Sequence, residues 1–192
     1  EAYRRLAGGI SCDFEEKTAY VYSRDNGKKL EDESDIYRRM GIDTVFTEKP
    51  PIPVKTAGAL GMHRQAQFHP IKFLNAVSEG LNIYEDTFVT EIKPGKLITE
   101  KGTVRARRII LATHYPMVNI LGLYFMKLYQ LRSYVLALEG AQDPDGMYID
   151  EREDGLSFRT YNGYLLLGGG SHRTGKPGGG WEELRRIAKA VY

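Results

Sequence analysis

The sequence predicts an α+β fold in which antiparallel sheet, placed early and late in the chain, is interleaved with a smaller α/β segment in the middle. Residues 127–168 hold short runs of alternating polar and apolar residues separated by Gly, Asp or Asn, which is typical of antiparallel strands. The middle part combines a helix-like segment with the unalternated apolar run IILA at 109–112, which is typical of a strand buried on both faces.

Length and composition are those of an ordinary globular protein. The 192 residues suffice for one large or two small domains, and 27 basic against 25 acidic residues leave a net charge of +2, so no nucleic acid or anionic membrane is required as a partner. No run approaches the roughly 18 apolar residues of a membrane span. The single cysteine, Cys12, cannot form an internal disulfide, which fits a reducing compartment, and the expected location is cytoplasmic.

The first 64 residues show helix and strand signals in turn. Residues 1–9 are typical of the last turns of a helix closed by glycine, and because no start methionine precedes them we expect a piece of a longer chain. Residues 11–23 alternate around a charged middle, which predicts two short strands joined by a turn. Residues 30–40 carry acids first and bases last, with Gly41 behind, which predicts a helix. A strand is expected at 44–46, before the irregular stretch PPIP at 50–53.

The middle of the chain predicts a helix followed by strands. In residues 67–80, Pro70 stands where a first helical residue belongs and Gly80 follows the end, so a helix with Ile71, Leu74 and Val77 on one face is expected. Strands are expected at 81–84, 88–93 and 96–100, with a proline–glycine turn before the last. The stretch 102–112 then leads into the buried strand.

The last third predicts an antiparallel sheet and a final helix. Strands are expected at 127–139, 146–150, 156–161 and 164–168. A glycine-rich loop at 168–180 follows. Residues 181–192 then predict a helix with the buried stripe Trp181, Leu184, Ala188 and Val191.

One stretch nearly matches a phosphate-binding loop. Residues 170–177, GSHRTGKP, follow a predicted strand and fit the pattern G-x-x-x-x-G-K. Pro177 stands where a magnesium-binding hydroxyl is needed, and three glycines follow where a helix should begin. We therefore expect a surface loop and no nucleoside-triphosphate site, although small residues there would also let a planar ligand approach the backbone.

The histidines suggest a ligand site and no metal. The chain has four, none of them spaced as local metal ligands: His63, His69, His114 and His172. No serine lies in a G-x-S-x-G elbow, so an acyl-transfer triad is not expected either. The last three histidines stand at the ends of predicted elements, where they are either hydrogen-bonded structural residues or ligand contacts. Because ligands of open α/β sheets bind beyond the carboxyl ends of the strands, the tripeptide Ala112, Thr113, His114 is placed where a cofactor would lie.

The order of the motifs resembles a known family. Along the chain come a helix after QFHP at 67–70, then GLNIYEDTFVTEI at 80–92, TVRARRIILATHYP at 103–116, LRSYVLALE at 131–139 and YLLLGGGSHRTG at 164–175. This order resembles the FAD-dependent oxidoreductases of the D-amino-acid oxidase, glycine oxidase and sarcosine oxidase superfamily. The resemblance implies an antiparallel-sheet substrate domain at 1–64 and 121–192, interleaved with part of a Rossmann-like FAD-binding α/β domain at 65–120.

The resemblance also implies site residues. The backbone of Val89 would meet the adenine of FAD, and Ala112, Thr113 and His114 would pass close to the dinucleotide. Three segments would lie toward the flavin ring and the substrate: the helix start at 67–69 with His69, the strand at 132–134 with Tyr134, and the loop at 168–172 with His172.

A substrate anchor is expected on a strand of the substrate sheet. Arg159 and Tyr161 are the candidates for holding a substrate carboxylate, because a guanidinium fork suits that group. A solvated strand face explains these two residues equally well.

Two parts of the family pattern are absent from the sequence. These are the N-terminal G-x-G-x-x-G turn and the glycine-rich C-terminal segment that closes the flavin site. We therefore expect an interior region that binds FAD weakly or not at all by itself and needs the rest of the parent chain to complete the site.

The predicted function follows from the resemblance. It is that of an FAD-dependent oxidoreductase which oxidises the C–N bond of a small-molecule amine or amino acid by hydride transfer to the flavin. The alternative is a non-catalytic binding or assembly module, because the predicted sheet is rich in tyrosine, of which the chain has 13, and tyrosine is favoured at protein interfaces.

Overall fold

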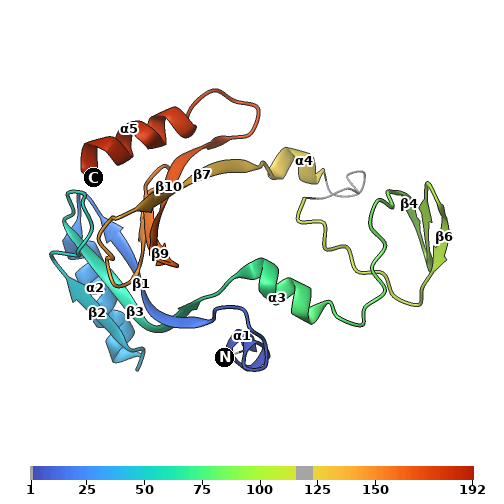
Figure 1. Cartoon of the computed structure of the whole chain (residues 1–192), viewed down its shortest axis with the longest axis horizontal. Helices are drawn as coiled ribbons and strands as arrows, with labels where there is room; N and C mark the ends of the chain where they lie inside the picture. Colours follow the sequence, from blue (N-terminus) through green and yellow to red (C-terminus); the bar gives the residue numbers. More distant parts are fainter. Residues whose placement is uncertain (1, 116–122) are drawn as a thin grey trace. The chain divides into compact units, whose positions relative to one another are not determined.

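The computed structural model describes residues 2–115 and 123–192 and divides the chain into two compact units (Figure 1). The first unit comprises Glu1–Phe73 and Tyr129–Tyr192, and the second comprises Leu74–Leu128. The predicted domain boundaries near residues 64 and 120 stay a prediction.

A seven-stranded sheet forms the first unit. Its strands are β1 (Glu15–Ser23), β2 (Thr44–Thr47), β3 (Gly58–Gln67), β7 (Leu131–Glu139), β8 (Met147–Asp150), β9 (Ser157–Tyr161) and β10 (Tyr164–Arg173). The spatial order is β2-β3-β1-β8-β9-β10-β7. Neighbours are antiparallel except β1 and β8, which run parallel with Val21 opposite Ile149. This parallel pair joins the early and late parts of the chain in one sheet, and the α+β prediction is confirmed.

The core of the first unit lies between the sheet and the last helix, α5 (Trp181–Val191). Four side chains that point toward α5 are at most 4% exposed: Tyr22, Tyr148, Phe158 and Leu167. From α5 itself, Leu184 and Ala188 enter this core. Burial of these large apolar groups is the main stabilising contribution to the unit.

Other helices complete the first unit. α2 (Gly27–Arg39) packs on β3, β2 and β1, and it begins after Asn26, whose side chain accepts a hydrogen bond from the Lys29 amide. Side chains alternate along a strand, so Val21 and Ile149 face away from α5, and they line a cavity together with Leu30 of α2. A smaller cluster buries Ala7 of α1 (Ala2–Ala7), Cys12, and Phe73 of α3 (Pro70–Val77).

The second unit contains a three-stranded antiparallel sheet. Its strands are β4 (Val89–Lys93), β5 (Lys96–Thr99) and β6 (Gly102–Arg105), and the short helix α4 (Tyr124–Lys127) follows. The predicted turn joins β4 to β5, with Gly95 at a φ of 72°. No helix in the described part of the chain is both long enough and apolar enough to cross a lipid bilayer.

The predicted buried strand at 109–112 is wrong in this structure. These residues are irregular, and Ile110 and Leu111 are 88% and 51% exposed. An unalternated strand is stable only when its backbone groups find partners and both of its faces are covered. Among residues 2–115 and 123–192, no strand pairs with this run, so its apolar side chains stay uncovered. Pro116, which ends the motif, lies outside the described residues.

Several other elements differ from prediction, and α4 was not predicted. The stretch 11–23 contains one strand, β1, and not two, because β1 pairs with β3 continuously through a bulge between Lys17 and Ala19. The strand predicted at 81–84 is wrong, since these residues are irregular. β3 is not predicted by its sequence, GALGMHRQAQ, which has no alternating apolar pattern; its pairing with β1 and β2 makes it a strand. The remaining predicted helices and strands are confirmed, with two corrections: β10 continues to Arg173, into the stretch predicted as loop, and Trp181, predicted in the buried stripe of the last helix, is 47% exposed.

Candidate functional site

An open groove crosses strands β7, β10, β9 and β8 on the sheet face that points away from α5. Apolar side chains are uncovered there: Val135 is 52% exposed and Ile149 56%. The groove has a volume of about 410 Å³ and is lined by Leu131, Ser133, Tyr134, Val135, Ile149, Asp150, Glu151, Arg152, Glu153, Gly155, Ser157, Gly168, Gly169 and Ser171. We call it the sheet groove. Its size lies within the range of small-molecule sites.

The glycines of β10 are required by packing within the sheet. A Cβ at Gly168 would lie 2.3 Å from Ser157 Oγ, and one at Gly169 would lie 2.7 Å from Leu156 Cδ2. Gly169 also lets Leu184 of α5 approach, since the same Cβ would lie 3.2 Å from its Cδ1. Part of the glycine run that the sequence associates with ligand approach is therefore explained by close contacts between neighbouring strands and α5.

Two hydroxyl groups mark one end of the sheet groove. Ser133 Oγ on β7 and Ser171 Oγ on β10 lie 2.9 Å apart. In a hydroxyl pair one group donates to the other, and the accepting hydroxyl keeps its own hydrogen free. This end can therefore donate one hydrogen bond to a ligand and accept others.

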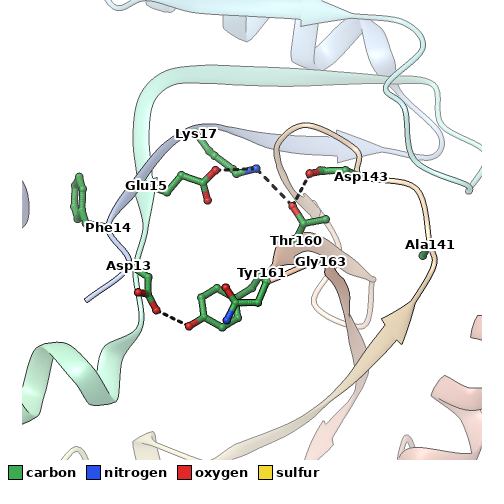
Figure 2. A pocket seen from close by; sticks show the side chains of 10 residues that line it. Asp13, Phe14, Glu15, Lys17, Ala141, Asp143, Thr160, Tyr161 and Gly163 are labelled. Atoms are coloured by element: carbon green, nitrogen blue, oxygen red, sulfur yellow. Dashed lines mark hydrogen bonds and ion pairs between the residues drawn. The ribbon is translucent and has the colours of Figure 1, made fainter. Parts of the chain in front are cut away.

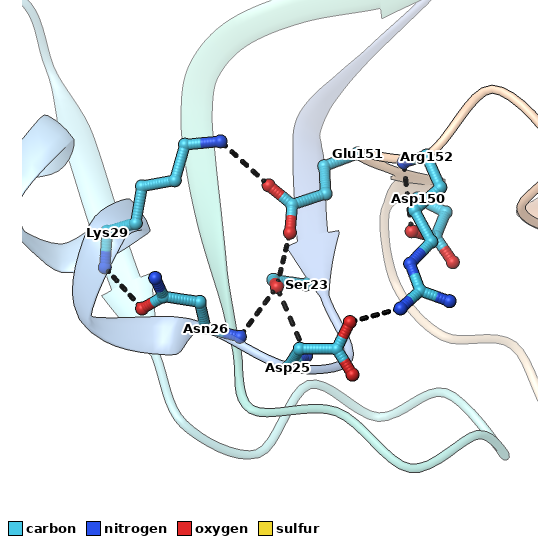
Figure 3. A network of polar contacts seen from close by, with 7 residues as sticks. All are labelled: Ser23, Asp25, Asn26, Lys29, Asp150, Glu151 and Arg152. Carbon is cyan, nitrogen blue, oxygen red and sulfur yellow. Dashed lines mark hydrogen bonds and ion pairs between the residues drawn. The ribbon is translucent and has the colours of Figure 1, made fainter.

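The other end of the sheet groove is charged, and two of its charged side chains, Glu151 and Arg152, are paired (Figure 3). The Glu151 carboxylate accepts hydrogen bonds from Ser23 Oγ at 2.5 Å and Lys29 Nζ at 3.0 Å. These two donors, Ser23 first, lower the pKa of Glu151. The Arg152 guanidinium pairs with Asp25. At this rim, Glu151 and Arg152 therefore each have a partner of opposite charge.

A buried carboxylate supports the same rim. Asp150 is fully buried, and its Oδ2 lies 2.8 Å from Arg24 Nε. The two atoms form an ion pair without hydrogen-bond geometry. Asp150 Oδ1 accepts from the Arg152 amide at 3.1 Å, which fixes the turn after β8.

One predicted site residue, Tyr161, lines a second, polar pocket (Figure 2), and another, His69, packs against Tyr161. Their rings are 5.9 Å apart, edge to face. The Tyr161 hydroxyl donates to Asp13 at 2.5 Å, and Lys72 Nζ lies 2.7 Å from the same carboxylate oxygen. The hydrogen bonds from Lys72 and Tyr161 lower the pKa of Asp13, and the carboxylate in turn raises the pKa of both donors.

His69 has a structural role at the start of α3. Its Nδ1 accepts a hydrogen bond from the Lys72 amide at 3.3 Å, as a helix-capping side chain does. Its backbone amide donates to the Cys12 carbonyl at 2.7 Å. The predicted flavin-edge role of His69 stays a prediction.

Tyr134 and His172 form a second pair, on the α5 face of the sheet. The Tyr134 hydroxyl lies 3.0 Å from His172 Nε2, and the Trp181 ring packs edge-on against Tyr134 at 5.1 Å. His172 Nδ1 lies 3.1 Å and 3.0 Å from the carbonyls of Arg173 and Lys176, which only accept. The neutral imidazole therefore carries its hydrogen on Nδ1, and Nε2 accepts from Tyr134.

The same contacts shape the glycine-rich loop. The bond from His172 to Lys176 closes a turn after β10, and α5 begins only at Trp181, beyond three glycines. Lys176 is thus not at a helix start, as the phosphate-loop pattern would require.

Arg159 lies two residues beyond Ser157 on β9, so its side chain is on the sheet-groove face. Its Nη1 donates to Gln67 Oε1 at 3.2 Å, and Gln67 is in turn held by Glu15 and the Thr160 carbonyl. Arg159 forms no ion pair among the described residues. Its predicted role as a carboxylate anchor stays a prediction.

The remaining predicted contacts lie in the second unit. Val89 is on β4, and Ala112, Thr113 and His114 are exposed, with His114 at a φ of 61°. Thr113 Oγ1 donates to the Tyr115 carbonyl at 2.8 Å. These cofactor contacts stay predictions as well.

By resemblance, the sequence placed the segments 132–134 and 168–172 of the sheet groove toward the ligand, but it did not single out Ser133 or Ser171, and it missed Ile149. The serines stand inside the motifs LRSYVLALE and YLLLGGGSHRTG, so the motifs located the region. Their pairing depends on the register of β7 and β10, which places Arg132 opposite His172 and cannot be read from either strand alone.

The described residues fit FAD in part. The sheet groove offers apolar surface at Val135 and Ile149 and one hydroxyl donor from the Ser133–Ser171 pair, which suits one face of a planar polar ring. In the described part of the chain, no turn of the G-x-G-x-x-G pattern joins a strand to a helix as a pyrophosphate site requires; the turn from β1 to α2 has the single glycine Gly27. The same residues contain no group of three or more His, Cys, Asp or Glu side chains that could hold a metal ion.

Comparison with known proteins identifies relatives over the whole chain. Residues 1–192 match the family model DAO, FAD dependent oxidoreductase. The chain is 34% identical over 201 residues to a Bacillus subtilis (strain 168) protein provisionally named as the Rieske 2Fe-2S iron-sulfur protein YhfW, covering 95% of this chain and 40% of that protein.

Solved structures share the fold. Glycine oxidase from Bacillus cereus ATCC 14579 matches with a TM-score of 0.68 at 18% identity, over 100% of this chain and 58% of that one. L-proline dehydrogenase from P. horikoshii matches with a TM-score of 0.69 at 14% identity, over 97% and 58%. The chain thus spans less than two thirds of each of these relatives. The predicted family is confirmed, its cofactor is FAD, and the chain belongs to the DAO family of FAD dependent oxidoreductases.

Proposed function

We propose that this chain supplies the substrate-binding sheet of an enzyme that oxidises the C–N bond of an amine or amino acid. The observation that carries the proposal is the sheet groove, which is open, of ligand size and lined by both apolar and hydroxyl groups. Several structural relatives act on amines or amino acids by name, among them glycine oxidase and L-proline dehydrogenase.

The roles of the groups follow from their chemistry. Bound FAD supplies a two-electron acceptor: the amine gives up a hydride and a proton and becomes an imine. Ser133 and Ser171 orient the polar end of the substrate by hydrogen bonds, and Val135 and Ile149 exclude water from one side of it. Arg159 holds an anionic group of the substrate, whereas the Tyr161 hydroxyl is already engaged by Asp13.

Anaerobic reduction of the flavin tests this function. The complete FAD-containing protein is mixed with a panel of primary and secondary amines and amino acids, and the loss of oxidised-flavin absorbance is followed. At least one compound should bleach the flavin, and the double variant Ser133→Ala, Ser171→Ala should slow that bleaching. If no amine of the panel bleaches the flavin, the proposed reaction is wrong.

We also propose that residues outside this chain complete the FAD site. The support is that the described residues form no pyrophosphate turn and that the chain spans 58% of the two solved relatives. Titration of the 192-residue chain with FAD, followed by flavin fluorescence, should show weak binding or none. Tight stoichiometric uptake would contradict this.

A second candidate concerns the electron acceptor. The relative with 34% identity bears a Rieske 2Fe-2S name, and we propose that the reduced flavin passes its electrons to such a cluster. A Rieske cluster needs two Cys and two His ligands, and this chain has one cysteine, so the cluster would be held by other residues of the complete protein. Anaerobic addition of an amine that bleaches the flavin should then produce the paramagnetic signal of a reduced 2Fe-2S cluster. If the complete protein contains no iron, the proposed electron acceptor is wrong.

The tyrosine-rich assembly module is the weaker alternative. Tyr22 and Tyr148 are buried in the core, and Tyr20 stacks on Tyr148 with centroids 4.5 Å apart. These rings face α5 and the interior, so several of the tyrosines that suggest an interface are core residues.

A further inference from the structure

A second cavity lies beside the sheet groove, between α2 and the sheet. It has a volume of about 330 Å³, and its wall is mostly apolar. The apolar part comes from Val21, Leu30, Leu60, Met62, Met147 and Ile149. We call it the α2 cavity.

The α2 cavity continues the sheet groove. Ile149 and Ser157 line both spaces, from β8 and β9. A ligand that lies across Ile149 can therefore occupy both. Ile149 is 56% exposed although it is on an inner strand of the sheet, so it offers apolar surface that no described residue covers.

Arg159 stands on the wall of the α2 cavity. Its guanidinium has one hydrogen bond, to the neutral Gln67, and no carboxylate partner among the described residues. Glu33 also lines the cavity; its carboxylate accepts a hydrogen bond from the Tyr37 hydroxyl at 2.8 Å and forms no ion pair with Arg159. A half-buried guanidinium beside an apolar wall loses part of its hydration without gaining a counter-ion. An anionic ligand would supply that counter-ion and so bind favourably beside Arg159.

The distance from Arg159 to the hydroxyl end of the groove bears on the substrate. Arg159 is opposite Leu166 on β10, and Ser171 is five residues further along that strand. At the rise of an extended strand this is roughly 16 Å. An α-amino acid is far too short to reach both ends.

We propose that the substrate is an amine with an apolar chain and a distal carboxylate, the amine end lying at Ser133 and Ser171, the chain across Ile149 in the α2 cavity, and the carboxylate at Arg159. This rests on the proposed function for the position of the reacting amine. The assignment of an anionic, apolar ligand to the α2 cavity rests on the cavity alone.

Ligand binding tests the cavity without any reaction. Butanoate, hexanoate, octanoate and octanol are titrated into the 192-residue chain by calorimetry. Carboxylate affinity should rise about fourfold for each added methylene until the cavity is filled. Arg159→Met should lower octanoate affinity by roughly tenfold or more, while leaving octanol affinity unchanged. The matched control is Arg185→Met, on the exposed side of α5, which should change neither.

Ile149→Ser separates the apolar contribution from the charge. Because Ile149 is more than half exposed, the variant should fold, keep its butanoate affinity and lose affinity for octanoate. Equal binding of octanoate by the wild type and Arg159→Met, or affinity independent of chain length, would overturn the proposal.

Flavin reduction in the complete protein separates this proposal from the function on which it rests. Of the compounds glycine, 6-aminohexanoate and 12-aminododecanoate, the longest should bleach the flavin fastest, and Arg159→Met should remove the advantage. Bleaching by short amines alone would refute the distal carboxylate and keep the proposed function. No bleaching by any amine, with octanoate binding intact, would refute the proposed function and keep the α2 cavity as an anion-capped apolar site.

Discussion

Replacing Tyr134 by phenylalanine should remove one hydrogen bond and leave the aromatic packing in place. The hydroxyl lost is the one that donates to His172 Nε2 at 3.0 Å. The ring that remains still packs edge-on against Trp181 at 5.1 Å. The variant therefore separates the two contributions that hold the end of β10 and the start of α5 together.

The loss in the free energy of unfolding should be small for Tyr134→Phe and larger for Tyr134→Leu. A neutral hydrogen bond contributes about 1 kcal/mol to stability, and His172 is only half-buried, so water can replace the lost donor in part. Tyr134→Phe should therefore lower the free energy of unfolding by about 1 kcal/mol or less. Tyr134→Leu also loses the aromatic contact, worth a further ~0.5–1.5 kcal/mol.

The assay uses the single tryptophan of the chain, Trp181, which reports directly on this region. Urea unfolding is followed by its fluorescence, and Tyr164→Phe, at an exposed position of β10, is the matched control. A loss for Tyr134→Phe equal to that for Tyr134→Leu, or no loss for either, would refute the reasoning. Ring-nitrogen NMR should in addition find the hydrogen of neutral His172 on Nδ1; hydrogen on Nε2 would show that the assigned tautomer is wrong.

Three further predictions concern the first unit. Leu167→Ala should lower the free energy of unfolding, measured in urea, by about 2–5 kcal/mol, because Leu167 is fully buried between the sheet and α5. In contrast, Val135→Ala should lower it by less than about 1 kcal/mol, because the Val135 side chain is half exposed. Asp150→Asn should lower the free energy of unfolding by about 1–3 kcal/mol, because it breaks a buried ion pair whose partner, Arg24, is 35% exposed and can regain water. The control Asp25→Asn removes an exposed ion pair, and its free energy of unfolding should be within about 1 kcal/mol of the wild type. Equal losses for the two variants would show that burial does not set the strength of the Asp150 pair. The pKa of Asp13 is lower in the folded protein than in the unfolded chain. The stabilisation that its ionised carboxylate gives to the fold is therefore complete above the pKa of Asp13 in the unfolded chain and is lost as the pH falls below about 4. The urea midpoint of the wild type should thus fall more steeply than that of Asp13→Asn between neutral pH and pH ~3, and parallel curves would show that Lys72 and Tyr161 do not favour the ionised carboxylate.

Elements with strong local signals could be predicted from the sequence. Pro70 marks the start of α3, and Asn162 and Gly163, both at positive φ, form the tight turn between β9 and β10. The same pattern reasoning missed β3 and misassigned residues 109–112. In both cases the state of the segment depends on which other strands pair with it, and a local pattern carries no information about partners.

For the candidate site, the sequence predicted which segments take part, and the structure showed which of their side chains lie next to one another. The motifs around Tyr134 and His172 were recognised separately, and the hydrogen bond between them follows from the pairing of β10 with β7. Alternation then puts Tyr134 toward α5 and Ser133 toward the sheet groove. Predicting a residue on a strand is therefore easier than predicting the face on which it acts.

The sequence by itself determined the family, the order of most helices and strands and the α+β class, because these depend on local patterns and on motif order. Only the tertiary structure decided that β1 pairs in parallel with β8, so that residues more than a hundred positions apart share one sheet. That pairing sets Val21 beside Ile149, and with it the α2 cavity and its continuation into the sheet groove. The physical reason is that strand pairing satisfies backbone hydrogen bonds between distant segments, and the choice of partner depends on how well the whole core packs.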